Sequence, residues 1–425
     1  MTLPQPDRTQ APPFRPIESY TLPKPERRQL SNGQPLFVWK THTQPVVSLQ
    51  MLLRAGRVFE EQPNTAAFVA KMLAEGTRAR DHSEITDYIA QRGAYLNIRV
   101  TGHFLEIDLF CLPRFLPEML KLLHEILTTA TFPAERLRQV ANLEVEQLRV
   151  NRQKNGFTAS ELFREQLFGK AHPSGRHLTP ERMRAISSEE LQTFFESHVR
   201  LRPAEWLLTG VFSEDIPQLI DRYFGQDELR PLPEFPVYPP TPDYRVFDRQ
   251  KEQSVQTSLR FGRLTLNPTS AGFPALRVLN EVFGGYFGSR LMQNLREKKG
   301  LTYGIFSQLQ PLRNQPAIWF IGADVRKENR QEARDEIFRE LNKLQEELLE
   351  EDELETVLNA LCGSFVGDLS TPFAVTEKFR QLRRLGLPDT HYDTLIPAWR
   401  QVSPEAIRAA AQQYGQGDWL EVFVG

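Results

Sequence analysis

Residues that would build a metal site, a disulfide framework or a membrane span are scarce in this sequence. Only two of the 425 residues are cysteine, and Cys111 and Cys362 both lie in apolar runs. Two such thiols exclude a disulfide framework and a zinc site of Cys ligands, and they favour buried free cysteines. The eight histidines include no two that are three or four residues apart, which excludes a zinc site with both His on one helical face.

Long apolar segments and a strong net charge are also absent. No window reaches the length of a transmembrane helix, and Met1–Tyr20 lacks the charged start and apolar core of a secretory signal. We therefore expect no membrane span and a cytoplasmic protein, with a periplasmic location as the alternative if a signal has been trimmed from the sequence. The formal net charge of -2 gives no reason to expect nucleic acid or an anionic membrane as a partner. The length allows two or three globular domains.

One stretch, Asn64–Thr77, is predicted to be a core helix. Its sequence, NTAAFVAKMLAEGT, begins with Asn64 at an N-cap and reaches Gly76 where a C-terminal stop belongs. Only Lys71 and Glu75 interrupt its apolar surface. The helix is therefore expected to pack on several sides rather than lie on a solvated face.

A Pro-rich segment, RPLPEFPVYPPTPD at 230–243, divides the chain into two nearly equal parts. Its proline density excludes a helix or a central strand and predicts an extended connector. Five segments of the first part match five segments of the second part in the same order, which indicates that one α+β unit is present twice. The pairs are 46–57 with 255–263, 64–77 with 273–281, 115–128 with 333–349, 133–148 with 352–365, and 187–212 with 403–425. We predict an extended arm at 1–27 and domains at 28–229 and 244–425, joined by the linker 230–243.

Two motifs make the chain resemble a known family. Ala66, Met72, Gly76 and Thr77 match the frame of the helix that carries H-x-x-E-H in the M16 zinc peptidases, the inverzincins. The segment FGGYFGSRLMQNLREKKGLTYGIF at 283–306 resembles the second signature of that family, G-G-x-x-S-R-L-x-x-x-L-R-E-x-x-G-L-x-Y. With the duplicated layout, residues 28–425 are identified as a member of the M16 (M16B) family, similar to mitochondrial processing peptidase. The resemblance implies two LuxS/MPP-like α+β domains that form a clam-like half-chamber.

The zinc chemistry of the family is missing from the first motif. The resemblance places the two His positions of H-x-x-E-H at Ala67 and Lys71, and the Glu position at Ala70. Alanine offers no donor atom, and an ammonium has no lone pair and repels a cation. None of the three residues can therefore hold zinc or accept a proton from an attacking water.

The third metal ligand of the family is a Glu on a later helix. The best register places it at Gln147, while Glu144 and Glu146 are close enough for a slip to restore a carboxylate. One carboxylate does not rebuild a zinc site, so we expect no metal in this chain. Lys71 is expected to pair with Glu75 one turn on, or with Glu144 or Glu146.

The second motif keeps the residues that M16 peptidases extend across the chamber to the zinc site. Carried over from the family, they are Arg296 and Tyr303. An arginine can bind a peptide carbonyl or carboxylate, and a tyrosine hydroxyl can donate to a developing oxyanion. The simpler interpretation is a salt bridge between Arg296 and Glu297 and a tyrosine that caps a strand. The resemblance also implies a loop that lines the substrate chamber and contains Gly284, Gly285, Ser289 and Arg290. Within this loop, Tyr286 and Phe287 depart from the family pattern.

The asymmetry between the two motifs predicts a divided enzyme. M16B enzymes include heterodimers in which one subunit holds H-x-x-E-H with zinc and the other donates the Arg/Tyr pair. We expect this chain to be the non-catalytic subunit of such a heterodimer, helping to bind a peptide substrate, with zinc in the partner. Two alternatives stay open: an inactive scaffold, like the core proteins of respiratory bc1 complexes, and a homodimer that binds peptides without cutting them.

Overall fold

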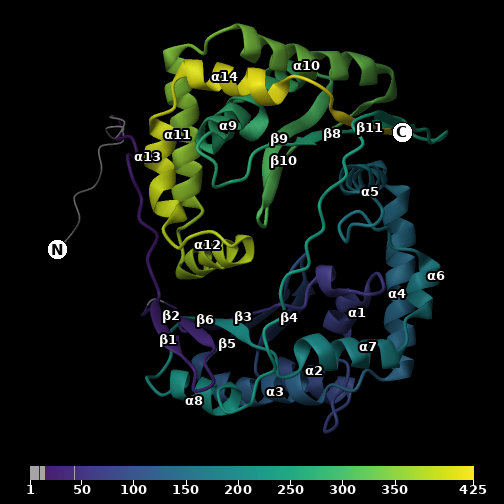
Figure 1. Cartoon of the computed structure of the whole chain (residues 1–425), viewed down its shortest axis with the longest axis vertical. Helices are drawn as coiled ribbons and strands as arrows, with labels where there is room; N and C mark the ends of the chain where they lie inside the picture. Colours follow the sequence, from purple (N-terminus) through teal and green to yellow (C-terminus); the bar gives the residue numbers. More distant parts are fainter. Residues whose placement is uncertain (1–8, 10–14, 43) are drawn as a thin grey trace.

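The structure is a computed structural model that describes residues 9, 15–42 and 44–425. Of the predicted arm, residues 1–8 and 10–14 lie outside the described residues. We call residues 26–229 the first half and residues 244–425 the second half. Each half contains one sheet with helices packed on it, and the two halves face each other across a central space (Figure 1). The predicted α+β class is confirmed.

The first half alternates short strands with helices in the way that its hydrophobic patterns indicate. Its elements are β1 (Glu26–Gln29), β2 (Pro35–Lys40), β3 (Val47–Leu53), η1 (Arg57–Phe59), α1 (Thr65–Met72), α2 (His82–Gln91), β4 (Tyr95–Val100), β5 (Leu105–Cys111), η2 (Pro113–Phe115), α3 (Leu116–Thr129), α4 (Ala134–Gln153), α5 (Asn155–Phe168), α6 (Pro180–Ala185), α7 (Ser188–Phe194), η3 (Phe195–Val199), β6 (Ala204–Gly210) and α8 (Ile216–Phe224).

The second half repeats this pattern with longer central strands. Its elements are β7 (Val246–Arg249), β8 (Gln256–Leu264), α9 (Phe273–Asn280), η4 (Glu281–Gly285), η5 (Met292–Lys298), β9 (Thr302–Leu312), β10 (Gln315–Arg326), η6 (Lys327–Asn329), α10 (Arg330–Glu346), α11 (Glu351–Gly367), α12 (Pro372–Leu385), η7 (His391–Thr394), α13 (Leu395–Arg400), α14 (Pro404–Gly415) and β11 (Leu420–Val424).

The two sheets share one topology. The first has the order β1-β2-β6-β3-β5-β4 and the second β7-β11-β8-β10-β9. In each, one pair is parallel, β2 with β6 and β7 with β11, and the following pairs are antiparallel. The strands β3 and β8, which the sequence repeat matched, occupy the same central place. The repeat in the sequence is therefore a repeat of strand order and direction.

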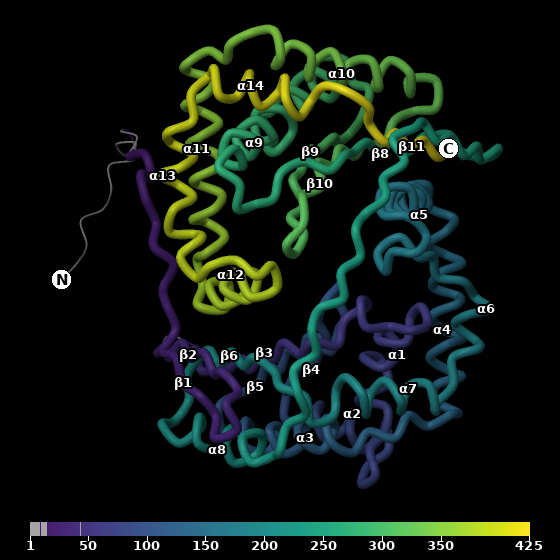
Figure 2. Tube along the Cα trace, in the orientation of Figure 1, coloured from purple at the N-terminus to yellow at the C-terminus, as the bar shows by residue number. Residues whose placement is uncertain are grey.

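One helix of each half packs on the sheet of the other half. Helix α5 packs on β8 and β11 of the second half, and α12 packs on β6 of the first (Figure 2). At α5 the contact is apolar, with Phe163 edge-on to Phe320 at 4.9 Å. At α12 polar and apolar contacts combine: buried Arg380 pairs with Asp108, Arg383 pairs with Glu205 at 2.6 Å, and the ring of Phe379 lies 4.9 Å from that of Phe37. This exchange joins the halves through their sheets.

Two extended segments also run between the halves. In the arm before β1, the backbone N–H of Leu22 donates to Asp393 at 3.0 Å, and Arg400 donates to the carbonyl of Ile17 at 3.1 Å. In the linker 230–243, Phe235 is held between the guanidinium groups of Arg54 and Arg313, 4.5 and 4.4 Å from the ring centre. The linker is thus extended, as predicted, and anchored at its middle.

The sequence also made predictions about the two cysteines and about the lengths of the helices. Cys111 and Cys362 are free and buried, as expected, and burial raises the pKa of the Cys111 thiol to about 12. Within the described ranges, no helix is both long and apolar enough to span a membrane.

Candidate functional site

The core helix α1 forms where the sequence predicts it, but its ends differ from the prediction. Asn64 stands at the N-cap with a φ of 75°, and its side chain caps nothing. The buried carboxylate of Glu60 caps the helix instead, accepting from the backbone N–H groups of Asn64 and Ala66 at 3.0 Å. The helix ends at Met72, four residues before Gly76, where a Cβ would lie 2.8 Å from Pro133. Gly76 therefore serves close packing.

Lys71 projects from α1 towards α4 and forms an ion pair there. Its Nζ lies 2.7 Å from Oε1 of Glu144, and the lysine side chain is 42% exposed. Of the three partners expected for Lys71, the structure selects Glu144. Glu146 pairs with Arg149 at 3.3 Å, and Gln147 is exposed further along α4. Glu144 is thus the α4 carboxylate that faces the H-x-x-E-H positions.

These residues do not fit a zinc ion. Ala67 is half-buried and Ala70 buried on α1, and neither has a donor atom. The ammonium of Lys71 donates to the carboxylate of Glu144, and it has no lone pair with which to bind a metal. Across the described part of the chain, no group of three His, Cys, Asp or Glu side chains is placed to hold a metal ion. The donor chemistry of this site supports no metal-assisted step in this chain.

The second motif folds into two π-helical segments, η4 and η5, followed by the edge strand β9. Gly284 permits the close approach of β9, since a Cβ there would lie 2.7 Å from the Cβ of Ser307. Arg290 forms two hydrogen bonds of 2.9 Å with Glu353 on α11. Ser289 is buried, and a Cβ on Gly285 would meet the carboxylate of Glu281. In this structure these four residues hold the segment in place; their predicted role in a chamber loop stays a prediction.

Arg296 and Tyr303 lie on either side of the turn between η5 and β9. The guanidinium of Arg296 is 4.9 Å from the ring centre of Phe287, and its Nε is 3.4 Å from Glu297. Tyr303 is 93% exposed, and no hydrogen bond involves its hydroxyl within the described structure. The salt bridge of the simpler interpretation is thus present but long, and the strand-capping role for Tyr303 is absent. Phe287, a departure from the family pattern, holds the arginine.

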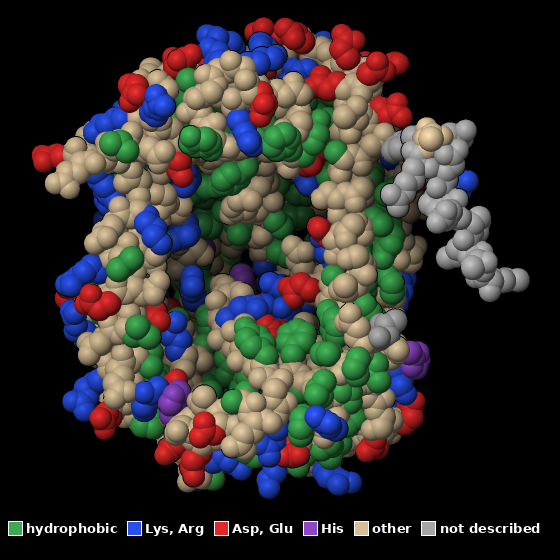
Figure 3. All heavy atoms as spheres, turned by 180° about the vertical axis from the view of Figure 1, so that it is seen from behind, with side chains coloured by type: hydrophobic (Ala, Val, Ile, Leu, Met, Phe, Trp, Pro, Cys, Tyr) green, Lys and Arg blue, Asp and Glu red, His purple; other side chains and the backbone are tan. Residues whose placement is uncertain are grey.

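A cavity of about 570 Å³ lies between the two halves. Its walls come from the start of α1, from α5 and the loop after it, and from β9 and β10 of the second half. Seen from behind, the molecule is hollowed between its halves (Figure 3). Three arginines in this cavity escaped the sequence analysis, Arg57, Arg164 and Arg176, because no local spacing relates them.

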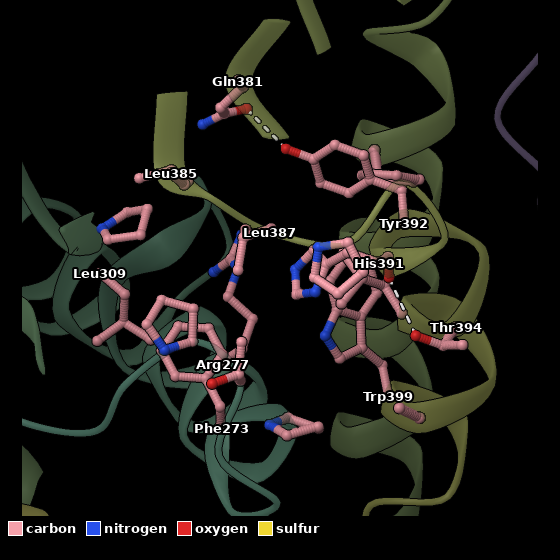
Figure 4. Close-up of a pocket in the computed structure, with 18 of the residues that line it drawn as sticks. Phe273, Arg277, Leu309, Gln381, Leu385, Leu387, His391, Tyr392, Thr394 and Trp399 are labelled. Atoms are coloured by element: carbon pink, nitrogen blue, oxygen red, sulfur yellow. Dashed lines mark hydrogen bonds between the residues drawn. The ribbon is translucent and has the colours of Figure 1, made fainter. Parts of the chain in front are cut away.

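A second cavity, of about 520 Å³, lies within the second half beside α9, α12 and η7 (Figure 4). Its lining is largely apolar, with Phe273, Leu387 and Trp399 around Arg277. Lys378 lies 5.1 Å from the ring centre of Phe365, and burial lowers its pKa. Arg277 is paired with Glu281 at 2.8 Å. The two cationic side chains of this cavity therefore already interact within the protein, Arg277 with a carboxylate and Lys378 with an aromatic ring.

Comparison with known proteins matches both halves to one family. The family model described as "Insulinase (Peptidase family M16)" matches residues 37–171, and "Peptidase M16 inactive domain" matches residues 185–361. A Helicobacter pylori protein named "Non-peptidase homolog YmxG" is 24% identical over 64% of each chain. "Uncharacterized zinc protease YmxG" of Bacillus subtilis is 21% identical over 84% of this chain and 87% of that one. "Probable inactive metalloprotease YmfF" of Bacillus subtilis is 30% identical over 29% of this chain and 30% of its own length.

Solved structures show the same fold. A peptidase M16 inactive domain from Pseudomonas fluorescens superposes with a TM-score of 0.81 at 21% identity, covering 94% of this chain and 98% of that one. A protease from Helicobacter pylori gives 0.83 at 16% identity, covering 95% and 99%. The duplicated α+β halves, the altered H-x-x-E-H helix and these matches lead to one conclusion: the chain belongs to the M16 peptidase family, as an inactive M16-like protein.

Proposed function

We propose that this chain is the non-catalytic subunit of an M16B heterodimer, which supplies Arg296 and Tyr303 to the active site of a zinc-bearing partner. The observation that carries the proposal is the exposure of Tyr303, whose ring and hydroxyl are open to an incoming molecule. A large aromatic side chain exposed to this degree is typical of a contact surface, and the same motif presents Arg296 over a second exposed ring, Phe287.

The chemistry of the pair suits a peptide in a partner's active site. Arg296 presents a fork of donors that can bind a peptide carbonyl, and the Tyr303 hydroxyl can donate to an oxygen that gains negative charge. Neither residue is held by a strong partner within its own chain, so both can be engaged without breaking a buried interaction. The ion pair between Lys71 and Glu144 agrees with this division, because it removes the chain's own H-x-x-E-H positions from metal binding.

A second candidate function is a peptide-binding scaffold without catalysis, in a homodimer or a larger assembly. Two observations favour it: several relatives are named as non-peptidase or inactive proteins, and the cavity between the halves is large enough for part of a peptide. The two candidates differ in whether Arg296 and Tyr303 contribute to cleavage. For both we propose a soluble setting, the cytoplasm, and no nucleic-acid partner.

The test mixes this protein with an M16 protein of similar size from the same source that has intact H-x-x-E-H. We expect zinc-dependent cleavage of peptides only in the mixture. Because one donor to an oxyanion contributes about a hundredfold or more to turnover, Tyr303→Phe and Arg296→Ala should each lower kcat by at least about that factor.

Matched controls exist on the first half. Tyr95→Phe changes a 59% exposed tyrosine on β4, the strand that corresponds to β9, and Arg149→Ala removes an exposed arginine on α4. Both should leave activity of the mixture unchanged. Full activity with Arg296→Ala and Tyr303→Phe would rule out a contribution in trans, and a mixture with no activity would leave the scaffold as the better description.

A further inference from the structure

The cavity between the halves has one apolar wall and one charged wall. Phe157 and Phe163 on α5 and Phe320 on β10 form the apolar wall. The rings of Phe163 and Phe320 are 4.9 Å apart, and Phe306 on β9 follows at 5.8 Å from Phe320. This row of rings leads out of the cavity to Phe306, which is exposed three residues after Tyr303. Phe163 and Phe320 are buried, so Phe157 and Phe306 are the rings of this row that an extended chain could contact between the cavity and the exposed start of β9.

The charged wall contains arginine side chains that are available to bind a ligand. Arg57, Arg164 and Arg176 line the cavity, and none of them forms a side-chain hydrogen bond or ion pair within the described structure. The Nη1 atom of Arg176 is buried without any partner. Burial, and then the nearby charge of Arg57, lower the pKa of Arg164, while the charge of Glu161 raises it.

The carboxylates of the same cavity are already engaged. Glu60 accepts from two backbone N–H groups of α1, and burial raises its pKa. Glu161 accepts from Arg152 at 3.1 and 3.2 Å and lies 3.7 Å from His177. The charges of Glu60 and Glu161 offset part of the charge of Arg57 and Arg164, but within the described structure no carboxylate forms an ion pair with any of the three arginines, and such an arrangement attracts carboxylates or other anions.

We propose that the cavity binds an acidic peptide segment, whose carboxylates engage Arg57, Arg164 and Arg176 while its apolar side chains contact Phe157 and the exposed Phe306. A peptide fits better than a nucleic acid, since the apolar wall matches side chains and the whole chain is slightly acidic, at -2. A small inorganic anion would leave the aromatic row without a contact.

This inference rests on the proposed function only in placing a peptide between the halves. Its test therefore uses the isolated full chain, with no partner and no cleavage. The probe is a fluorescein-labelled dodecapeptide of Glu-Leu-Glu-Phe repeats, and the comparison probes replace every Glu by Gln or by Lys. Fluorescence anisotropy should show binding of the acidic peptide that weakens with added salt.

The arginines identify the site. Because a charge-assisted hydrogen bond contributes enough free energy for about a tenfold change in affinity, R57Q/R164Q should weaken binding of the acidic peptide by about a hundredfold, and R176Q by about tenfold. The matched control, R138Q/R149Q, removes two exposed charges from α4 outside the cavity and should change the affinity less than about twofold. Melting temperatures of all variants should stay equal, as the cavity arginines have no structural partners.

Three outcomes would overturn the inference. They are equal binding of the Glu and Gln peptides, equal loss in the cavity and control variants, and tighter arginine-dependent binding of a 12-nucleotide oligouridylate. Peptide binding without activity in the mixture would support the inference and contradict the proposed heterodimer. Activity in the mixture without arginine-dependent binding would do the reverse.

Discussion

At the scale of single residues, the ion pair between Lys71 and Glu144 shows how the H-x-x-E-H helix was altered without losing its fold. The pair bridges α1 and α4 at 2.7 Å on a partly exposed surface, so its own contribution to stability is small. What it changes is chemistry, because a cation now stands where neutral nitrogen donors would be needed. The contact also makes the register of α4 testable.

Two histidines on α1 should recreate part of a metal site. In A67H/K71H the imidazoles stand four residues apart on one helical face, and Glu144 is the nearest carboxylate on α4. We expect this variant to bind one zinc or cobalt ion, measured as bound metal and as the cobalt absorption spectrum, and E144Q added to it should abolish binding. Retention of metal after E144Q, with loss only when Gln147 is also changed, would instead favour the register at Gln147.

His177 provides a pH-dependent contribution to stability. Interaction with the carboxylate of Glu161, and then with that of Glu165, raises the pKa of His177 above its ordinary value of 6.5. The interaction thus stabilises the fold fully below about pH 6.5 and is lost as the pH rises through the raised pKa. Burial raises the pKa of the Glu161 and Glu165 carboxyl groups, but their interactions with His177 outweigh it and lower the pKa of both. The stability that these two carboxylates contribute is therefore lost only in acid.

His177→Asn should therefore lower the melting temperature more at about pH 6 than at about pH 8.5. His42→Asn, at a position without a resolved carboxylate partner, should show no such difference. A loss that is equal at both pH values would mean that the imidazolium is not the stabilising form.

At the scale of elements, the exchange of α5 and α12 is the feature that makes one molecule of two repeats. Helix α5 covers one face of the second sheet mainly with apolar contacts, whereas α12 meets the first sheet through both the ion pair of Arg380 and the ring of Phe379. The two contacts should therefore respond differently to substitution.

Phe163→Ala should destabilise the protein by about 3 kcal/mol or more, because it opens a cavity among Phe163, Phe320 and the strands beneath. Urea unfolding gives the free energy, and hydrogen exchange of β8 and β11 shows whether the loss is local. Leu143→Ala, on the exposed face of α4, should cost less than about 0.5 kcal/mol. A comparable loss in both variants would indicate that α5 does not bury this face in solution.

Arg380→Ala should cost about 3 kcal/mol, at the lower end for a broken buried ion pair, since Arg99 still contacts Asp108 at 2.7 Å. Arg339→Ala, an exposed arginine on α10, is the matched control and should be nearly neutral. Urea unfolding of both variants measures the two changes in stability. An Arg380→Ala variant as stable as the unchanged protein would show that α12 is held chiefly by its apolar contacts.

At the scale of the whole molecule, the halves are tied together in three ways, by the arm, by the linker and by the exchanged helices. Phe235 anchors the linker between two arginines, while Val237 two residues on is 84% exposed. The linker thus offers a place where the chain can be cut without disturbing a packed side chain.

A protease site introduced at Val237 should yield two fragments that stay together. Because α5 and α12 each lie on the sheet of the other half, cleavage removes one covalent link and leaves these interfaces intact. We expect one peak in size-exclusion chromatography and two bands under denaturing conditions. Adding Phe163→Ala and Arg380→Ala to the cleaved protein should separate the fragments; separation without these changes would show that the linker, rather than the exchange, holds the halves.

The sequence by itself determined the repeat, the extended linker, the core helix and the replacement of the zinc-binding residues. The linker and the core helix follow from local patterns, since proline density and helix periodicity act within a few residues, whereas the repeat follows from the order of the matched segments and the replaced zinc-binding positions from the resemblance to the M16 family. The ends of α1 were not predictable in the same way, because Glu60 and not Asn64 provides the cap.

Only the tertiary structure decided which residues meet. The choice of Glu144 for Lys71, the exchange of α5 and α12, and the gathering of Arg57, Arg164 and Arg176 around one cavity join residues far apart in the chain. A helix that covers the sheet of another half has the same amphipathic pattern as one that covers its own, so periodicity cannot assign its partner. Likewise, an arginine without a counter-charge is recognised only when all of its neighbours in space are known.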